Sequence, residues 1–223
     1  MNSLIRVLVA GVLLLGAAQI AVPRVVGAEL ATALRSATGP GSTDSVAVGA
    51  VPFFELFQGR FQSLDWRATH VRAEGLHVAL VTASWTNGAV SVPALVNDHE
   101  LVILRRGQLE ATVRVGETAL ARFLDASGRI RNGTVTVGPS SVRLQGTVLI
   151  GGLAGPVDAT GRLAVSSDER QILFQPLSID GFGLPFRTTL VIFDVRTLKL
   201  PLPVRLTGIR LESPYVVVTA RSV

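Results

Sequence analysis

The chain has 223 residues, a formal net charge of +5 and no cysteine. Without cysteine, neither disulfides nor thiolate metal sites can contribute to its stability or its chemistry. Its length suits one domain with a sizeable core. The basic residues are almost all arginine, and a basic surface attracts anionic partners such as lipid headgroups or envelope polymers. An arginine bias on a solvated face explains the same charge equally well.

The N-terminus has the order of an export signal. Arg6 precedes an apolar run from Val7 to Val22, and the end of this run is rich in small residues. As a helix the run would extend over about 24 Å, slightly less than a bilayer core. Residues 1–22 are therefore expected to be either a cleaved signal peptide or a retained membrane anchor. Residues 23–223 are expected to form a single domain outside the cytoplasm, in the periplasm, the cell envelope or the medium.

Helices are expected to be few and short. The first runs from Pro23 to about Ser36, the second from Pro52 to Gly59, and the third from Glu117 to Ala126. Between Phe186 and Thr197 the β-branched residues favour extended chain as well as they favour a helix. The apolar side chains of the second and third helices are Phe53, Phe54 and Phe57, and Leu120, Phe123 and Leu124.

Strict alternation of apolar and polar residues predicts long strands over most of the remaining chain. The clearest cases are Gln108 to Val115, Val142 to Ile150 and Val157 to Val165, in which Val148 and Leu163 lie on the apolar side. Between Val204 and Leu211 the alternation changes phase at Gly208, which predicts a β-bulge. Three further strands are expected at Leu64 to Val71, His77 to Trp85 and Tyr215 to Arg221.

Glycine-containing pairs between these runs predict the turns of an antiparallel meander. There are too few helices to cover a flat sheet of this area, so the sheet must fold over on itself or around a helix. The predicted fold is α+β, mostly β, with a strongly curved antiparallel sheet of long strands wrapped around a helix. Both a solid core and an elongated cavity would place the same residues inside. The turn pairs are Asn87-Gly88, Arg106-Gly107, Asn132-Gly133 and Gly151-Gly152.

The segment from Val48 to Phe61 passes from a strand to Pro52, a short apolar helix and the pair Gly59-Arg60. This order resembles the opening of the LmeA family of phospholipid-binding bacterial envelope proteins. The helix at Glu117 to Ala126 and the two closing strands agree with it, whereas Asn87 to Asp98 departs from it as an inserted or irregular loop. The resemblance covers nearly all of the chain after Ala28. It implies a fold like that of tubular lipid-binding domains, an extracytoplasmic location and binding of phospholipid.

No pattern of catalytic or metal-binding residues accompanies these features. The three histidines have no second ligand at a recognisable spacing, and there is no Gly-x-Ser-x-Gly elbow. The carboxylates that could form an acid and base pair fall in loops or on the polar side of strands. The chain is therefore expected not to be an enzyme, to need no cofactor or metal and to bind no nucleic acid.

The leading hypothesis is that the apolar interior holds acyl chains, in lipid transport or envelope biogenesis, while arginines at the rim meet the phosphate. The aromatic residues around the second helix and in the loop from Phe182 to Phe186 would line the groove or touch a bilayer. Plain packing at the ends of the sheet explains them as well. The competing hypothesis is a non-catalytic scaffold module that binds anionic polymers. The candidate lipid contacts are Phe53, Phe54, Phe57, Phe61, Leu120, Phe123, Leu124, Val148, Leu163, Phe182 and Phe186, and the candidate headgroup contacts are Arg60 and Arg187.

Overall fold

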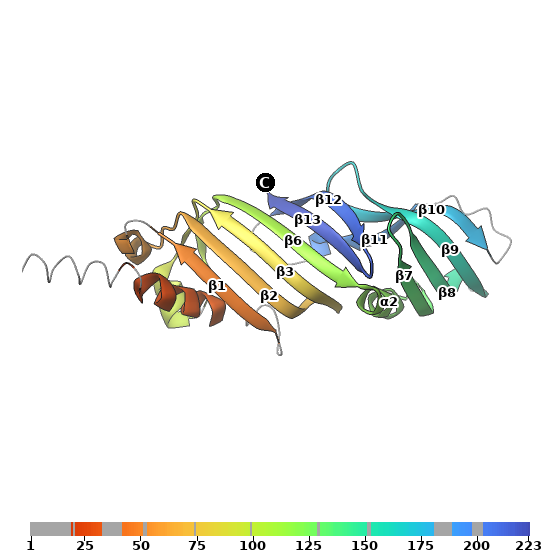
Figure 1. The fold of residues 1–223 in the computed structure, drawn as a ribbon, viewed down its shortest axis with the longest axis horizontal. Helices are drawn as coiled ribbons and strands as arrows, with labels where there is room; N and C mark the ends of the chain where they lie inside the picture. The colour runs from red at the N-terminus through yellow and green to blue at the C-terminus, as the bar shows by residue number, and fades with distance from the viewer. Residues whose placement is uncertain are drawn as a thin grey trace, which may run out of the picture. The chain divides into compact units, whose positions relative to one another are not determined.

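The computed structural model describes residues 19, 21–32, 42–50, 53–73, 75–98, 100–128, 130–150, 153–180, 189–197 and 203–223. Most of the predicted signal or anchor, and the apolar loop with Phe182, Phe186 and Arg187, lie outside these residues. The described chain is mostly β-strand with few helices (Figure 1). The predicted α+β, mostly β class is confirmed.

The strands form three sheets. The six-stranded sheet has the order β1-β2-β3-β6-β13-β12, the five-stranded sheet has the order β11-β10-β9-β8-β7, and β4 pairs with β5. The strands are β1 (Thr43–Gly49), β2 (Ser63–Ala73), β3 (Leu76–Thr86), β4 (Ala89–Val90), β5 (Ile103–Arg105), β6 (Gln108–Gly116), β7 (Arg131–Val137), β8 (Val142–Ile150), β9 (Leu153–Val165), β10 (Gln171–Asp180), β11 (Leu190–Asp194), β12 (Val204–Glu212) and β13 (Tyr215–Ser222). The helical elements are the helix of residues 21–32, the 3-10 helices η1 (Phe53–Gln58) and η3 (Val195–Thr197), the π-helix η2 (Ala94–Asp98) and the α-helix α2 (Glu117–Ala126).

The chain divides into two compact units. Unit 1 comprises Met1–Pro40, Asp44–Arg67 and Ala83–Leu109. Unit 2 comprises Gly41–Thr43, Ala68–Thr82 and Glu110–Val223. Strands β2 and β3 contribute residues to both units, whereas the whole five-stranded sheet belongs to unit 2.

The strand and helix patterns of the sequence are closely matched. Strand β8 and helix α2 have the predicted bounds. The predicted bulge is present, because β12 pairs Leu206 with Ala220 and then Gly208 with Thr219, which leaves Thr207 as the extra residue. The ambiguous segment before Thr197 is extended as β11 and ends in η3.

Three local predictions were wrong. Asn132-Gly133 is not a turn between strands, because it lies inside β7, where the register shifts between Arg131 and Thr134. Asn132 has a φ of +49°, so the left-handed conformation that asparagine tolerates serves a bulge here. The first helix does not begin at Pro23, since residues 21 and 22 are already helical. The segment from Asn87 to Asp98 is more ordered than an irregular loop, since it contains β4 and η2.

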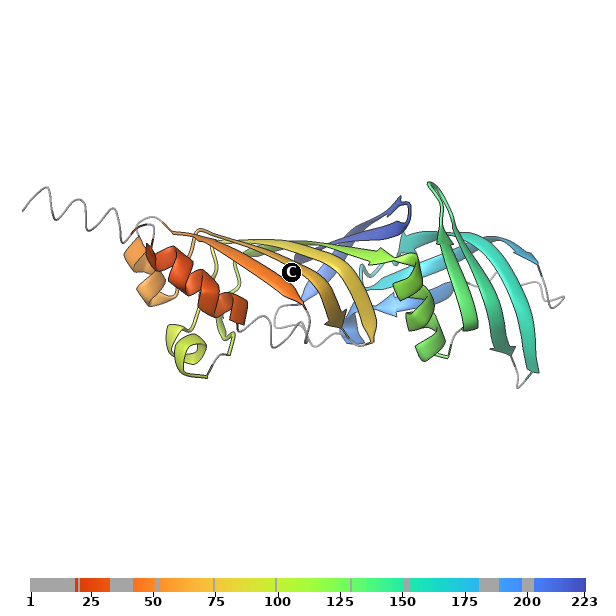
Figure 2. The same cartoon turned by 60° about the horizontal axis from the view of Figure 1, so that its bottom comes forward.

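In unit 2, the five-stranded sheet curls around α2. Strands β7 and β11 are the two edges of this sheet, and four strand spacings would separate them by about 19 Å if the sheet were flat. Helix α2 packs along the edge strand β7, and Val137 N of this strand donates a 2.6 Å hydrogen bond to Glu117 Oε1 of the helix. Yet Phe123 of α2 also meets Phe193 of β11, with ring centroids 5.9 Å apart. Both edges therefore approach the same helix, as the curl in Figure 2 shows.

The inner face of this sheet combines large and very small side chains. Phe174 of β10 is 1% exposed, and Gly161 of β9 lies beneath its ring. A Cβ atom at Gly161 would lie 2.6 Å from Phe174 Cζ and 2.5 Å from Gln175 O. The absence of a side chain at Gly161 therefore makes room for the aromatic ring, and this close packing fixes how β9 and β10 lie against each other.

In unit 1, the helix of residues 21–32 packs on β1. Gly27 is buried at the crossing, where a Cβ atom would lie 3.0 Å from Val46 O. Leu30 and Ala31 of the same helix are buried. Phe61 and Trp85 form an edge-to-face pair with centroids 4.8 Å apart, and the Trp85 indole donates a hydrogen bond to Arg106 O. No helix within the described residues is both long enough and apolar enough to cross a bilayer.

Among the described glycines of unit 1, Gly59 has the shortest contact with an added Cβ atom. It ends η1 with a φ of +73°, and an added Cβ would lie 1.8 Å from Val90 O, which is main chain and cannot rotate away. We expect Gly59→Ala to lower the free energy of unfolding by about 3 kcal/mol, from the left-handed conformation and the overpacking together. Urea denaturation measures this change. Gly75→Ala is the control, because Gly75 has a φ of +81° with nothing within 4 Å of the added Cβ, so its cost reports the conformation alone.

Candidate functional site

Unit 2 contains an apolar pocket between α2 and the surrounding strands. Its walls come from β3, β6 and β13, from α2, and from β9, β10 and β11. Every lining side chain is aliphatic or aromatic, so the pocket offers no hydrogen bond and no charge to a ligand. The lining residues are Leu76, Val115, Leu120, Phe123, Leu163, Ile172, Ile192, Phe193, Val216 and Val218.

The pocket is small in this structure. Its volume is about 40 Å³, whereas a single water molecule already needs about 10–15 Å³ on the same kind of measure. It cannot hold a long acyl chain without a change in its walls. The rings of Phe123 and Phe193 join α2 to β11 by an apolar contact. By contrast, the other side of α2 is tied to β7 by hydrogen bonds from Val137 N to Glu117 and from Asn132 N to Asp125.

The structure brings three of the candidate lipid contacts together in this pocket, namely Leu120, Phe123 and Leu163. Leu124, on the same helix, is 1% exposed and belongs to the core of unit 2 rather than to the pocket lining. Val148 is half-buried on β8 and lies outside the lining. Whether any of these residues contacts lipid stays a prediction.

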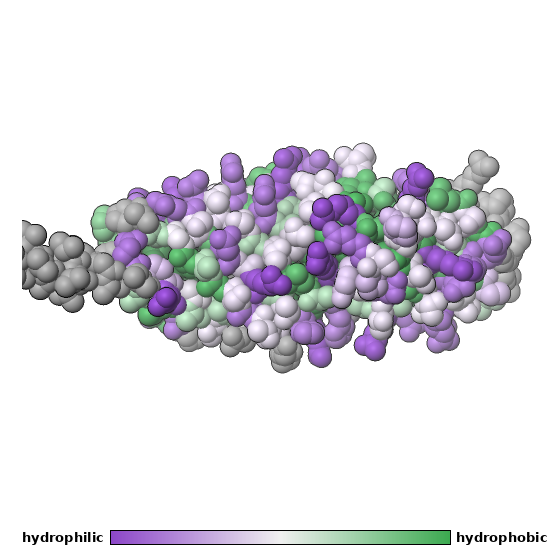
Figure 3. Space-filling view, in the orientation of Figure 1, coloured by the Kyte–Doolittle hydropathy of each residue, from purple (hydrophilic) through white to green (hydrophobic). Residues whose placement is uncertain are grey.

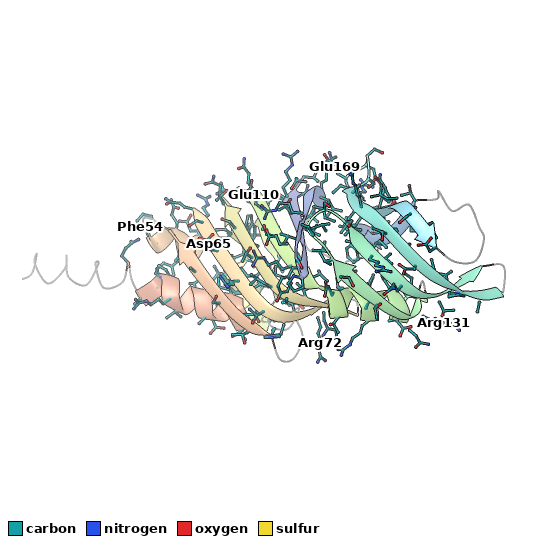
Figure 4. All side chains as sticks on the ribbon, turned by 45° about the vertical axis from the view of Figure 1, so that its right-hand side comes forward. Phe54, Asp65, Arg72, Glu110, Arg131 and Glu169 are labelled. Atoms are coloured by element: carbon teal, nitrogen blue, oxygen red, sulfur yellow. The ribbon has the colours of Figure 1, made fainter. Side chains whose placement is uncertain are left out.

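The candidate residues around η1 belong to unit 1 and do not line this pocket. Phe61 is 3% exposed and packs on Trp85, as a core residue does. Phe54 and Phe57 are 54% and 65% exposed, and Figure 4 shows Phe54 on η1. Arg60 is exposed directly after η1. The side chain of Phe53, together with Phe182, Phe186 and Arg187, lies outside what the structure describes.

Several pocket residues were missed in the sequence. Phe193 lies in the segment that fitted a helix and a strand equally well, so its direction could not be assigned. Val216 and Val218 lie in a run in which Val217 is also buried, and a run that is apolar on both faces shows no alternation. The direction of these side chains follows from the pairing of β13 with β6, which the sequence did not reveal.

Hydrophilic and hydrophobic residues are mixed on the visible face of the five-stranded sheet (Figure 3), and charged side chains of β8 and β9 pair there. Asp158 of β9 accepts hydrogen bonds from Arg143 Nε and from Gln145 Nε2, both at 2.8 Å. These bonds stabilise the ionised carboxylate and lower the pKa of Asp158 from 3.8 to about 2. The bond from Arg143 makes the largest contribution to this shift. Asp194 next to Arg196 likewise has a lowered pKa. Each carboxylate is held by an ion pair with its own arginine, and Asp158 lies on the opposite face of β9 from the pocket residue Leu163.

The Asp158 network should be visible in the acid stability of the protein. The unfolded carboxyl binds a proton at a higher pH than the folded one, so its stabilising contribution is present above about pH 4 and is lost as the pH falls through about 2. We expect Asp158→Asn to flatten the fall of the free energy of unfolding over this window, measured by urea titration at each pH.

The described residues contain no group of three or more His, Cys, Asp or Glu side chains that could hold a metal ion. His70 and His77 are exposed on strands β2 and β3. The apolar pocket is therefore the candidate site of unit 2. Its chemistry suits hydrocarbon and excludes charged or strongly polar ligands from its interior.

Comparison with known proteins agrees with this chemistry. The model of the LmeA-like phospholipid-binding family matches residues 17–221. No curated protein and no solved structure matches the chain. The match includes every strand and helix described above except the last residue of β13.

Proposed function

The chain belongs to the LmeA-like phospholipid-binding family, and from this premise we propose that it is an extracytoplasmic protein of the bacterial cell envelope that holds phospholipid acyl chains in the pocket of unit 2. Its role would be in lipid transport or envelope biogenesis. The observation that carries the proposal is the pocket lined only by aliphatic and aromatic side chains. Removing acyl chains from water contributes about 0.8 kcal/mol per buried CH₂. No cofactor and no catalytic step is part of the proposal.

A phospholipid tail needs more room than the 40 Å³ of the pocket, so binding requires its walls to part. We place the opening between Phe123 and Phe193. The contact between these two rings is apolar, whereas hydrogen bonds at Glu117 and Asp125 tie the opposite side of α2 to β7. A tail that enters beside Phe123 would replace the contact between the rings with contacts of its own, while α2 stays on β7.

The experiment that tests the proposal is mass spectrometry of an organic extract of the purified protein. We expect phospholipid to copurify with it, and the intact mass under native conditions to exceed that of the chain by the mass of the lipid. If repeated preparations contained no lipid, and none were taken up from vesicles, the proposal would be wrong. The intact mass of the denatured chain would also show whether residues 1–22 are removed.

The competing function is a non-catalytic scaffold module that adheres to anionic envelope polymers. The small volume of the pocket favours it, because a packed interior needs no ligand. So does the net charge of +5 carried almost entirely by arginine. Binding to an anionic polymer that weakens steeply with salt, in protein free of lipid, would support this alternative.

A further inference from the structure

Several large apolar side chains of unit 1 are exposed and do not belong to its core. They belong to η1, to η2 and to the segment containing β5. An isolated exposed apolar residue is ordinary, but several on neighbouring elements mark a contact surface. The exposed fractions are 65% for Phe57 and Leu104, 54% for Phe54 and Val96, and 41% for Val102.

Main-chain hydrogen bonds connect these elements to one another. Val90 N donates to Gly59 O at 2.9 Å, which links the end of η1 to β4. Ser91 N donates to Val102 O at 2.8 Å, which links the end of β4 to the chain entering β5. Element η2 forms the connection between β4 and β5. The η1–β5 surface, as we call it, is defined by Phe54, Phe57, Val96, Val102 and Leu104.

The apolar run of the N-terminus ends next to this surface. Gln19 lies near the end of the run, and its Nε2 donates a 2.7 Å hydrogen bond to Ala50 O. Ala50 lies at the end of β1, just before η1. Figure 2 shows η1, η2 and the helix of residues 21–32 at the same end of unit 1. If the apolar run enters a bilayer, the bond from Gln19 to Ala50 keeps η1 near that bilayer.

The charges around the surface are balanced. Basic and acidic side chains occur in equal number on η1, η2 and the chain around β5, so electrostatic attraction to anionic lipid is weak here. Apolar contact must supply the binding, as it does for side chains that dip into the headgroup and acyl boundary. The charged residues are Arg60, Arg105 and Arg106, and Glu55, Asp98 and Glu100.

We propose that the η1–β5 surface docks on the lipid bilayer beside the apolar N-terminal run, with Phe57 and Leu104 in the boundary between headgroups and acyl chains. This inference deepens the proposed function by naming the surface that meets the source of lipid. It rests on exposure and chain connectivity in unit 1 and does not require that the pocket of unit 2 be filled.

Site-directed spin labelling tests the proposal, because a chain without cysteine takes a nitroxide only where one is introduced. The full chain carrying Phe57→Cys or Leu104→Cys is mixed with phosphatidylcholine vesicles. We expect both labels to become less accessible to a water-soluble relaxation agent and more accessible to oxygen, which concentrates in the bilayer. Adding phosphatidylglycerol to the vesicles should change this little.

Ser45→Cys provides the matched control in unit 1. Ser45 is exposed on β1, and the five residues from it to Ala50 correspond to about 17 Å of extended chain. Its label should stay accessible to the water-soluble agent. In a Val102→Ser, Leu104→Ser background, the ratio of docked to undocked protein reported by the label at position 57 should fall about tenfold or more, because two aliphatic contacts are lost.

Two results would overturn the proposal. Labels at positions 57 and 104 that remain as accessible to the aqueous agent as the label at position 45 would exclude bilayer contact. Shielding that occurs without vesicles and grows with protein concentration would assign the surface to a second copy of the chain. The lipid content of the same samples, measured by extraction, reports the pocket separately, so the failure of docking and the failure of lipid holding can be told apart.

Discussion

Replacing Leu163 with glutamate is expected to reduce the lipid bound per protein by at least about tenfold. Leu163 lines the apolar pocket from β9, and a carboxylate there has no described partner in a wall made only of aliphatic and aromatic side chains. An ionised group without a partner is costly next to hydrocarbon. Quantitative mass spectrometry of extracts from protein of known concentration measures the loss.

Thr160→Glu is the matched control, because it adds the same charge to the same strand on the opposite face, where Thr160 pairs with Arg143 of β8. Leu163→Met keeps an apolar side chain of similar volume. Both control variants should load lipid as the parent does. Normal loading in Leu163→Glu, with an unchanged circular dichroism spectrum, would remove the pocket of unit 2 from consideration as the lipid site.

Phe174→Ala should produce the largest loss of stability, about 3–5 kcal/mol in the free energy of unfolding. The side chain is among the largest that are fully buried, and its ring covers Gly161, so truncation leaves a void over the centre of the five-stranded sheet. Urea denaturation followed by circular dichroism measures the change. A loss below about 1 kcal/mol would show that the inner face of this sheet is loosely packed.

A double-mutant cycle tests whether Phe174 and Gly161 act together. Gly161→Ala alone is expected to cost about 1–3 kcal/mol, because the new methyl group meets the ring. In the Phe174→Ala background its cost should be smaller, since only the contact with Gln175 O remains. Equal costs in both backgrounds would mean that the ring and the glycine are not coupled.

The sequence predicted the elements better than their contacts. Strand β8 and helix α2 were predicted with their observed bounds because the alternation of period two and the glycine after the helix are local signals. The bulge at Gly208 could be predicted for the same reason, since a change of phase is visible within one strand. The pair Asn132-Gly133 was wrongly predicted to form a turn, because a residue in the left-handed conformation occurs in β-bulges as well as in turns.

The residues of the candidate site were harder to predict from the sequence than the strands and helices were. Leu120, Phe123 and Leu163 lie in patterns that assign a face to each side chain, so they could be predicted as interior residues. What those faces meet depends on pairings between distant segments. Phe193 reaches α2 only because the sheet curls until its two edges approach the same helix. The amino-acid pattern predicted a curved sheet, but it did not indicate which edge strand would contact which residue of the helix.

The pairing of β13 with β6 has a consequence for the order of folding. Strands β7 to β11 are joined one after another by neighbour pairing, which has low contact order and forms early. One of the two neighbours of β6, in contrast, is β13, which follows β7 to β12 in the sequence and pairs Tyr215 with Gly116. During synthesis one edge of β6 therefore stays unpaired until β13 has left the ribosome. Truncation by even one strand should leave that edge exposed and the chain prone to aggregation.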